Sequence, residues 1–194
     1  MEGMDVLLDD DLKTKVFVKE ITESLQRGLD EGIDANNLVL EINSSRHAYN
    51  MNASQVIRHV TSVVVSISAA TPGEEGSNKA LLTAVTKNLS KVKDVFANYV
   101  KSASDQKDLL KGLENFFRMS PDKLAVVAKI VHHLYDMDLV EERAVVAWCE
   151  GLDLDEDCEE CSDPDFVSNL RKRMQPLIDW LQQSSSSEEE SDSD

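Results

Sequence analysis

The sequence has few of the residues that interrupt or cross-link a chain. Its 194 residues include 7 glycines, 4 prolines and 3 cysteines, and aromatic residues make up only 5%. Because Gly and Pro are the strongest helix breakers, their scarcity beside abundant Leu, Val, Ala, Lys and Glu predicts a helical protein. Three cysteines are too few, and odd in number, for the disulfide framework of a small secreted protein.

Long apolar runs are also missing. No stretch reaches the roughly 18 apolar residues that cross a bilayer. The acidic start, MEGMDVLLDDDLK, lacks the basic region and apolar run of a secretory signal. We therefore expect a soluble, cytoplasmic protein with no membrane partner.

Basic residues are outnumbered by acidic ones, 20 to 37, which gives a net charge of −17. Most of the excess lies in residues 141–194, which hold 17 Asp or Glu and 4 Lys or Arg, a balance of −13. A surface of this sign repels phosphate backbones and attracts basic proteins. The charge argues against direct nucleic-acid binding and favours a lysine-rich protein partner.

Apolar residues recur at helical spacing along most of the chain. The spacing predicts eight helices, over residues 16–32, 37–50, 54–69, 78–100, 104–119, 121–137, 140–151 and 163–183. We expect Gly28 and Gly32 to mark the end of the first helix and Asp34 or Asn36 to cap the second. We also expect a break near Ser90 and a bend at Pro176.

Eight helices with short connections predict an all-α, HEAT-like solenoid of stacked antiparallel helix pairs over residues 12–183. A globular helix bundle is the structural alternative, although a wide apolar arc on the interior helices favours stacking. Residues 1–11 are expected to be flexible, and residues 184–194, rich in Ser and acid, to form a disordered tail.

The stretch NLVLEINSSRHAYN, residues 37–50, places the carboxylate of Glu41 in an apolar run. On a helix the apolar side chains sweep an arc of roughly 200°, made by Leu38, Val39, Leu40 and Ile42. The remaining polar strip holds Asn37, Glu41, Ser44 and Ser45. Helix patterning alone therefore makes Glu41 an ordinary surface residue. Asn43 falls inside the apolar arc, so its amide needs a partner such as a loop carbonyl.

The same stretch, with LQRG at residues 25–28, resembles the C-terminal catalytic segment of the epsilon subunit of the guanine-nucleotide exchange factor for eukaryotic translation initiation factor two. EERAVVAWCEG and MQPLIDWLQQSSSSEEESDSD resemble that family's two aromatic-acidic boxes, here about residues 140–151 and 174–190. These boxes recur in initiation factor five. The resemblance covers roughly residues 13–194, and LVLEIN is the part specific to the epsilon subunit.

The resemblance implies a HEAT-like domain that promotes GDP release from the gamma GTPase subunit of initiation factor two. It makes Glu41 the main exchange determinant, and the boxes around Trp148 and Trp180 docking sites for the lysine-rich beta subunit. The nucleotidyltransferase-like and β-helix regions, through which the full subunit would assemble with the other subunits, have no counterpart here. Cys149 stands where the first box often has a second aromatic residue.

No GxxxxGK[ST] loop is present, so we expect the chain not to bind nucleotide itself. We also expect no cofactor, and no covalent chemistry, since an exchange factor needs none. An exchange factor needs only to bind the nucleotide-free partner more tightly than the GDP-bound one. A carboxylate can do this by competing for the partner's phosphate-binding Lys or by disfavouring its Mg²⁺ site. We expect Glu41 to act in this way, with Asn37, Ser44 and Arg46 helping to hold the partner.

The spacing of Trp148 and Trp180 from the residues three and four positions earlier suits core packing. The structural and docking roles are compatible, because a packed indole can brace an acidic surface. The expected partner-binding residues are Glu141, Glu142, Trp148, Glu150, Asp179, Trp180, Glu188, Glu189 and Glu190.

The tail holds serines that precede acidic residues by three positions, the pattern of acid-directed kinase sites. The expected phosphorylation sites are Ser186, Ser187 and Ser191, although the tail also has the composition of a solubilising segment. Cys158 and Cys161 form a single CEEC pair without the second pair that zinc requires, so we expect no metal. A binding scaffold without exchange activity, like the C-terminal domain of initiation factor five, is the alternative function.

Overall fold

A computed structural model of the whole chain describes residues 9–70, 77–153 and 163–188. The described residues form nine α-helices and two 3-10 helices, and none of them lies in a strand. The helices are α1 (Asp10–Glu31), α2 (Ala35–Ala48), α3 (Ala53–Ala70), α4 (Asn78–Lys91), α5 (Lys93–Tyr99), α6 (Ala103–Met119), η1 (Pro121–Val126), α7 (Val127–Asp136), α8 (Glu142–Glu150), η2 (Gly151–Asp153) and α9 (Pro164–Glu188). The predicted all-α class is confirmed.

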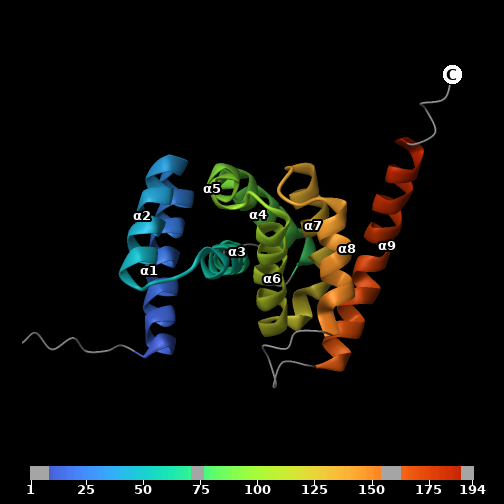
Figure 1. Cartoon of the computed structure of the whole chain (residues 1–194), viewed down its shortest axis with the longest axis horizontal. Coiled ribbons are helices and arrows are strands. Elements are labelled where there is room, and N and C mark those ends of the chain that lie inside the picture. The colour runs from blue at the N-terminus through green and yellow to red at the C-terminus, as the bar shows by residue number, and fades with distance from the viewer. Residues whose placement is uncertain (1–8, 71–76, 154–162, 189–194) are drawn as a thin grey trace, which may run out of the picture.

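The helices follow one another along the long axis of the molecule in nearly chain order (Figure 1). Helix α2 packs on α1 and α5, α3 packs on α4 and α6, and α9 packs on α7 and α8. Helix α3 is the most enclosed, with nine buried residues among its 18. This order is compatible with stacked helix pairs, and the regular repeat of a HEAT-like solenoid stays a prediction. In the part of the chain that the structure describes, no helix is long and apolar enough to span a membrane.

Local signals in the sequence explain where the helices begin. Asp34 caps α2 by accepting a hydrogen bond from the Asn36 backbone N–H at 3.1 Å. At the start of α3, the side chains of Asn52 and Gln55 each accept from the other's backbone N–H, at 2.8 and 2.9 Å. These side chains accept hydrogen bonds from backbone N–H groups at the start of each helix, which have no acceptor within the helix.

Two glycines near the end of α1 have different roles. Gly32 ends the helix in the left-handed region, with φ 68°, as predicted. Gly28 does not mark the end: it is buried inside α1, where a Cβ atom would lie 2.7 Å from both methyl carbons of Leu38. Gly28 therefore allows α2 to approach α1 closely.

Other boundaries differ slightly from those expected. The break between α4 and α5 lies at Val92, close to the predicted Ser90. Pro121 begins the 3-10 helix η1, which leads into α7. Helix α9 continues through Pro176 to Glu188, so residues 184–188, expected in the tail, are helical in the structure.

Gly112 of α6 lies tightly against the central helix α3. A Cβ atom there would lie 2.4 Å from the Arg58 carbonyl oxygen and 2.8 Å from the Thr61 Cβ. Because one obstacle is backbone, Gly112→Ala should separate the two helices and lower the free energy of unfolding by about 2 kcal/mol. Gly151→Ala is the control, since nothing lies within 4 Å of its Cβ position. Urea unfolding should show a loss for Gly112→Ala only, and equal midpoints would contradict this packing.

Candidate functional site

Glu41 lies on α2, which together with α1 forms one end of the molecule (Figure 1). Its Oε2 accepts a hydrogen bond from Arg27 Nη2 of α1 at 2.5 Å. The side chains are 36% and 46% exposed, respectively. Glu41 is thus ion-paired to a neighbouring helix but is not sealed inside the stack, and a partner can reach it.

Two of the residues predicted to act with Glu41 share its face of the helix. Asn37 stands four positions before Glu41 and Ser44 three positions after it, and both are exposed. Arg46 has a different place: it is half-buried, and its Nε donates to the Met51 carbonyl oxygen at 3.1 Å. The structure therefore places Asn37, Glu41, Ser44 and Arg27 close together, and we call these four residues the Glu41 strip. Arg46 instead stabilises the turn between α2 and α3.

The predicted apolar arc of α2 is wrong at Leu40. This leucine is 67% exposed, whereas Leu38 and Ile42 are buried and Val39 is partly buried. The reason is that α2 stands at an end of the row of helices, with α1 and α5 as its main neighbours (Figure 1). The helix consequently buries a narrow face, and an exposed leucine lies directly beside Glu41.

Polar bonds fix α2 in place behind this strip. Glu20 of α1 accepts hydrogen bonds from Ser45 Oγ at 2.6 Å and Tyr49 Oη at 2.7 Å, and these two bonds lower the pKa of Glu20. Tyr99 Oη of α5 donates to Asn43 Oδ1 at 3.0 Å. Asn43 is therefore satisfied by a tyrosine and not by a loop carbonyl. Burial raises the pKa of Tyr99 to about 12, so the phenol keeps its proton at neutral pH.

Trp148 belongs to the core. It is 2% exposed, and its Nε1–H donates to Glu114 Oε2 at 2.9 Å. The other Glu114 oxygen accepts from Arg118 Nε and Nη2 at 2.9 and 2.6 Å, and the Arg118 guanidinium lies 4.6 Å from the ring centre of Phe166. Trp148 was expected among the partner-binding residues, but its ring is not accessible to a partner. It braces α8 against α6.

Trp180 has the opposite environment. It is 44% exposed on α9, and its ring lies 4.8 Å from that of His132 and 6.1 Å from that of Tyr135, both on α7. Asp179 beside it is exposed and accepts from Gln175 at 2.8 Å. Among the predicted aromatic residues, Trp180 is the one that can present a ring face to a cation.

The predicted acids of α8 lie at its two ends. Glu142, at the first turn, accepts a hydrogen bond from Ser185 Oγ of α9, and Glu141 beside it is exposed. Glu150 lies in the last turn, where Arg171 of α9 donates to the carbonyl oxygens of Cys149 and Glu150 at 3.1 and 3.2 Å. We call Glu141, Glu142, Asp179 and Trp180 the aromatic–acidic surface. Glu150 lies about 12 Å from Glu142 along the helix axis, given the rise per residue.

Several predicted residues fall outside what the structure describes. Glu189, Glu190 and Ser191 lie beyond its last residue, as Cys158 and Cys161 lie in the gap before α9, and the side chains of Ser187 and Glu188 are not described. Ser186 is exposed, and its Oγ donates to the Gln182 carbonyl oxygen at 3.0 Å. Within the described ranges, no three His, Cys, Asp or Glu side chains are grouped as a metal site would need. Cys149 is buried, which raises the pKa of its thiol to about 12.

Sequence reasoning missed Glu114 and Arg27. Glu114 interrupts an apolar run on α6, as Glu41 does on α2, and Arg118 follows it by four positions. That spacing is the signal of a paired carboxylate. No comparable signal links Arg27 to Glu41, because the two residues meet only once α1 and α2 have packed.

Comparison with known proteins identifies sequences that are similar to this chain. Residues 105–193 match the family model described as "W2: eIF4-gamma/eIF5/eIF2-epsilon". The chain is 26% identical over 178 residues to "Translation initiation factor eIF2B subunit epsilon" of Dictyostelium discoideum, covering 91% of this chain and 24% of that protein.

Shorter matches join the chain to a second group of factors. It is 35% identical over 102 residues to "Eukaryotic translation initiation factor 5" of Phaseolus vulgaris, covering 52% of this chain and 21% of that protein. It is 30% identical over 122 residues to "Probable eukaryotic translation initiation factor 5-2" of Arabidopsis thaliana, covering 58% and 26%. The chain spans about a quarter of the length of these relatives.

Proposed function

We propose that the chain is a guanine-nucleotide exchange domain, because residues 105–193 match the W2 family model and the chain is similar to the epsilon subunit of eIF2B over 91% of its length. It promotes GDP release from translation initiation factor two during cytoplasmic protein synthesis. It contacts the gamma GTPase subunit through the Glu41 strip and the lysine-rich beta subunit through the aromatic–acidic surface.

The observation that carries the proposal is the state of Glu41. Its carboxylate is accessible, and among the described residues Arg27 is the cation that holds it, across two helices. A cation of the partner can take the place of Arg27, whose guanidinium is 46% exposed and can then be solvated, so neither charge is left buried and unpaired. The exposed Leu40 gives the same contact an apolar anchor.

Exchange then follows from linkage. If Glu41 engages a group that GDP or its Mg²⁺ also requires, the chain binds the nucleotide-free GTPase more tightly than the loaded one. The GTPase must then bind GDP more weakly, by the same factor, while the chain is attached. No covalent step is needed, and Asn37 and Ser44 supply hydrogen bonds on either side of Glu41.

The extent of the similarity favours exchange over a scaffold role. A match over 91% of the chain must include most of residues 25–50, where the Glu41 strip lies. The factor 5 matches cover 52% and 58% of the chain and need not include it. A binding scaffold without exchange activity, like factor 5, is the second candidate. The W2 match of residues 105–193 includes the aromatic–acidic surface but not the Glu41 strip.

The deciding experiment measures release of a fluorescent GDP analogue from purified initiation factor two, with this chain alone as the added component. Acceleration above the spontaneous rate supports exchange. Pull-down of the factor without acceleration would overturn exchange and leave the scaffold. Failure of both binding and acceleration would remove both roles.

Docking of a lysine-rich segment should depend steeply on salt. Individual exposed ion pairs contribute only about 0 to 1 kcal/mol, so the interaction must sum many of them. Raising salt from about 0.05 to about 0.3 M should weaken polylysine binding roughly tenfold or more. Fluorescence anisotropy measures the change, and binding indifferent to salt would contradict the proposal.

A matched pair of variants tests where polylysine docks. Glu141→Gln with Asp179→Asn removes two charges from the aromatic–acidic surface, and Glu23→Gln with Glu31→Gln removes two from exposed positions of α1. Only the first pair should weaken binding strongly, and equal losses would mean that net charge alone attracts the peptide. Phosphates on Ser186, Ser187 and Ser191 would add negative charge to the acidic C-terminal part of the chain and strengthen the same docking.

A further inference from the structure

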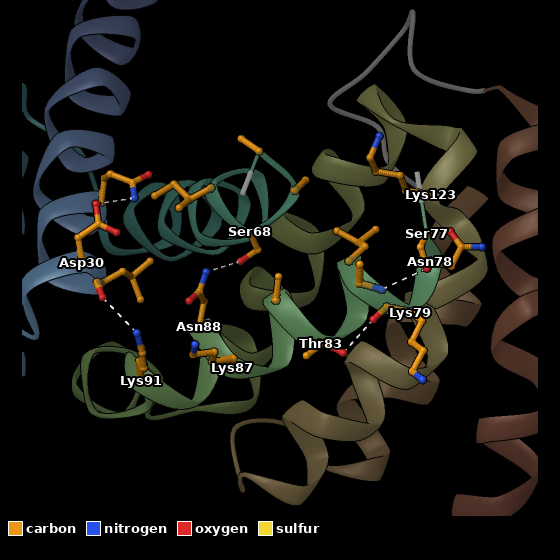
Figure 2. Close-up of a pocket in the computed structure, with 18 of the residues that line it drawn as sticks. Asp30, Ser68, Ser77, Asn78, Lys79, Thr83, Lys87, Asn88, Lys91 and Lys123 are labelled. Atoms are coloured by element: carbon orange, nitrogen blue, oxygen red, sulfur yellow. Dashed lines mark hydrogen bonds between the residues drawn. The ribbon is translucent and has the colours of Figure 1, made fainter. Parts of the chain in front are cut away.

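A groove rich in lysine lies on a part of the molecule that the proposed function does not use. It has a volume of 1040 Å³ and is bounded by α1, α3, α4 and η1 (Figure 2). Its cations are Lys79, Lys87, Lys91 and Lys123, and its anions are Asp30 and Asp122. A net positive groove is unexpected in a chain of net charge −17, and we call it the lysine groove.

Helix α4 provides most of the positive charge. Lys79, Thr83, Lys87 and Lys91 follow one another at four-residue spacing and all line the groove, so they form one row along the helix. Helix α4 contains three lysines and no acidic residue. Lys87 and Lys91 are like charges four positions apart, which opposes helix formation slightly. Lys79 lies in the first turn, where a cation opposes the helix dipole, and Lys91 in the last turn, where a cation favours it, so the row as a whole adds little to the stability of α4.

Both acidic side chains that line the groove have partners within the chain. Asp30 accepts from Gln26 Nε2 at 3.0 Å, and Asp122 pairs with Lys123 at 3.3 Å. Lys91 donates to the Leu29 carbonyl oxygen at 3.2 Å. Lys79 and Lys87 are exposed and have no ion-pair partner among the described residues. Figure 2 shows Lys87 and Lys91 toward the α1 side and Lys79 and Lys123 toward the other.

From this arrangement we propose that the lysine groove binds an acidic peptide segment of a partner protein. The row from Lys79 to Lys91 spans about 18 Å at the helical rise per residue, which matches about five or six residues of extended peptide. Ammonium groups at intervals along one wall would pair with Asp or Glu side chains. Leu81, an apolar lining residue that is partly buried, would contact the uncharged positions between them.

A nucleic acid fits the groove less well. Its lining includes no Phe, Tyr, Trp, His or Arg among the described residues, so bases would have no ring or guanidinium on which to stack. The acidic remainder of the chain would also repel an extended phosphate backbone more strongly than a short peptide. Residues 71–76, which follow the lining residue Ala70 in the sequence and precede the lining residue Ser77, lie outside the described residues.

The test uses the full chain and a fluorescein-labelled peptide of six glutamates, measured by fluorescence anisotropy. Lys79→Glu with Lys87→Glu should weaken binding at least about tenfold, because two attractive contacts become repulsive. Lys101→Glu with Lys107→Glu changes the net charge equally at exposed positions outside the groove and should have little effect. Equal losses in both variants would overturn the proposal.

Two further outcomes would also overturn it. If removal of residues 189–194 raised the affinity for the peptide tenfold, the groove would be filled by the chain's own acidic end. If a single-stranded RNA of equal charge displaced the peptide at lower concentration, the groove would be a nucleic-acid site. Polylysine binding and GDP release should be unchanged in the Lys79→Glu, Lys87→Glu variant, so a failure here is distinct from a failure of the proposed exchange function.

Discussion

Glu41→Gln should lower the rate at which saturating chain releases GDP from initiation factor two by about tenfold to a hundredfold. The variant keeps the size of the side chain but removes the charge that a partner cation would engage. A hydrogen bond to a charged group contributes about 1.5–3 kcal/mol, which corresponds to that range of rates. Release of a fluorescent GDP analogue, measured as a function of chain concentration, gives the rate.

Arg27→Gln is the matched control, because both variants remove the same ion pair. Arg27→Gln leaves the carboxylate in place and frees it from its internal partner, so exchange should be kept or increased. Helix content and thermal midpoint should be close to wild type in both variants, since both side chains of the pair are partly exposed. If the two variants lost exchange equally, the ion pair would matter for structure, and Glu41 would have no part in releasing nucleotide.

Trp148→Ala should be the most destabilising of the substitutions considered, at about 3–5 kcal/mol. The change leaves a large void between α6 and α8 and removes a donor from the buried Glu114 carboxylate. For a domain of this size the thermal midpoint should fall by roughly 6 to 20 °C. Circular dichroism during heating measures the shift.

Two other substitutions separate packing from binding. Trp148→Phe keeps an aromatic ring but not the N–H group, so it should cost about 1–3 kcal/mol through the unsatisfied Glu114 oxygen. Trp180→Ala should change stability much less, because Trp180 is 44% exposed, yet it should weaken polylysine binding. A Trp180→Ala variant that melts as early as Trp148→Ala would contradict the assignment of the two residues to core and surface.

The helices could be predicted from the sequence because their signals are local. Asp34 begins α2 and Gly32 ends α1 through contacts with residues a few positions away. Gly28 shows where this reasoning fails. A glycine near a helix end reads as a stop signal, and only the position of Leu38 reveals that it serves the contact between two helices.

Exposure was harder to predict than helix position. Trp148 and Trp180 stand at similar spacing from apolar neighbours, yet the first meets Glu114 of α6 and the second lies at the surface against α7. Leu40 shares its run with Leu38 and Ile42 but faces solvent, because its helix lies at an end of the molecule. The exposed fraction of a side chain depends on which helices pack against it, and the spacing of apolar residues in the sequence does not identify those helices. Glu41 could be singled out only through family resemblance, and its partner Arg27 only through the packed structure.

The close approach of α1 and α2 at Gly28 also bears on the ion pair between Arg27 and Glu41. Arg27 is the neighbour of Gly28 in the chain and Leu38 lies one helical turn before Glu41, so the glycine contact and the ion pair join the same stretches of α1 and α2. In Gly28→Ala, either the Leu38 methyl groups move or the two helices separate, and a separation would widen the gap between the Arg27 guanidinium and the Glu41 carboxylate. In the exchange step proposed above, the bare backbone at position 28 would therefore favour the short contact that a partner cation has to replace.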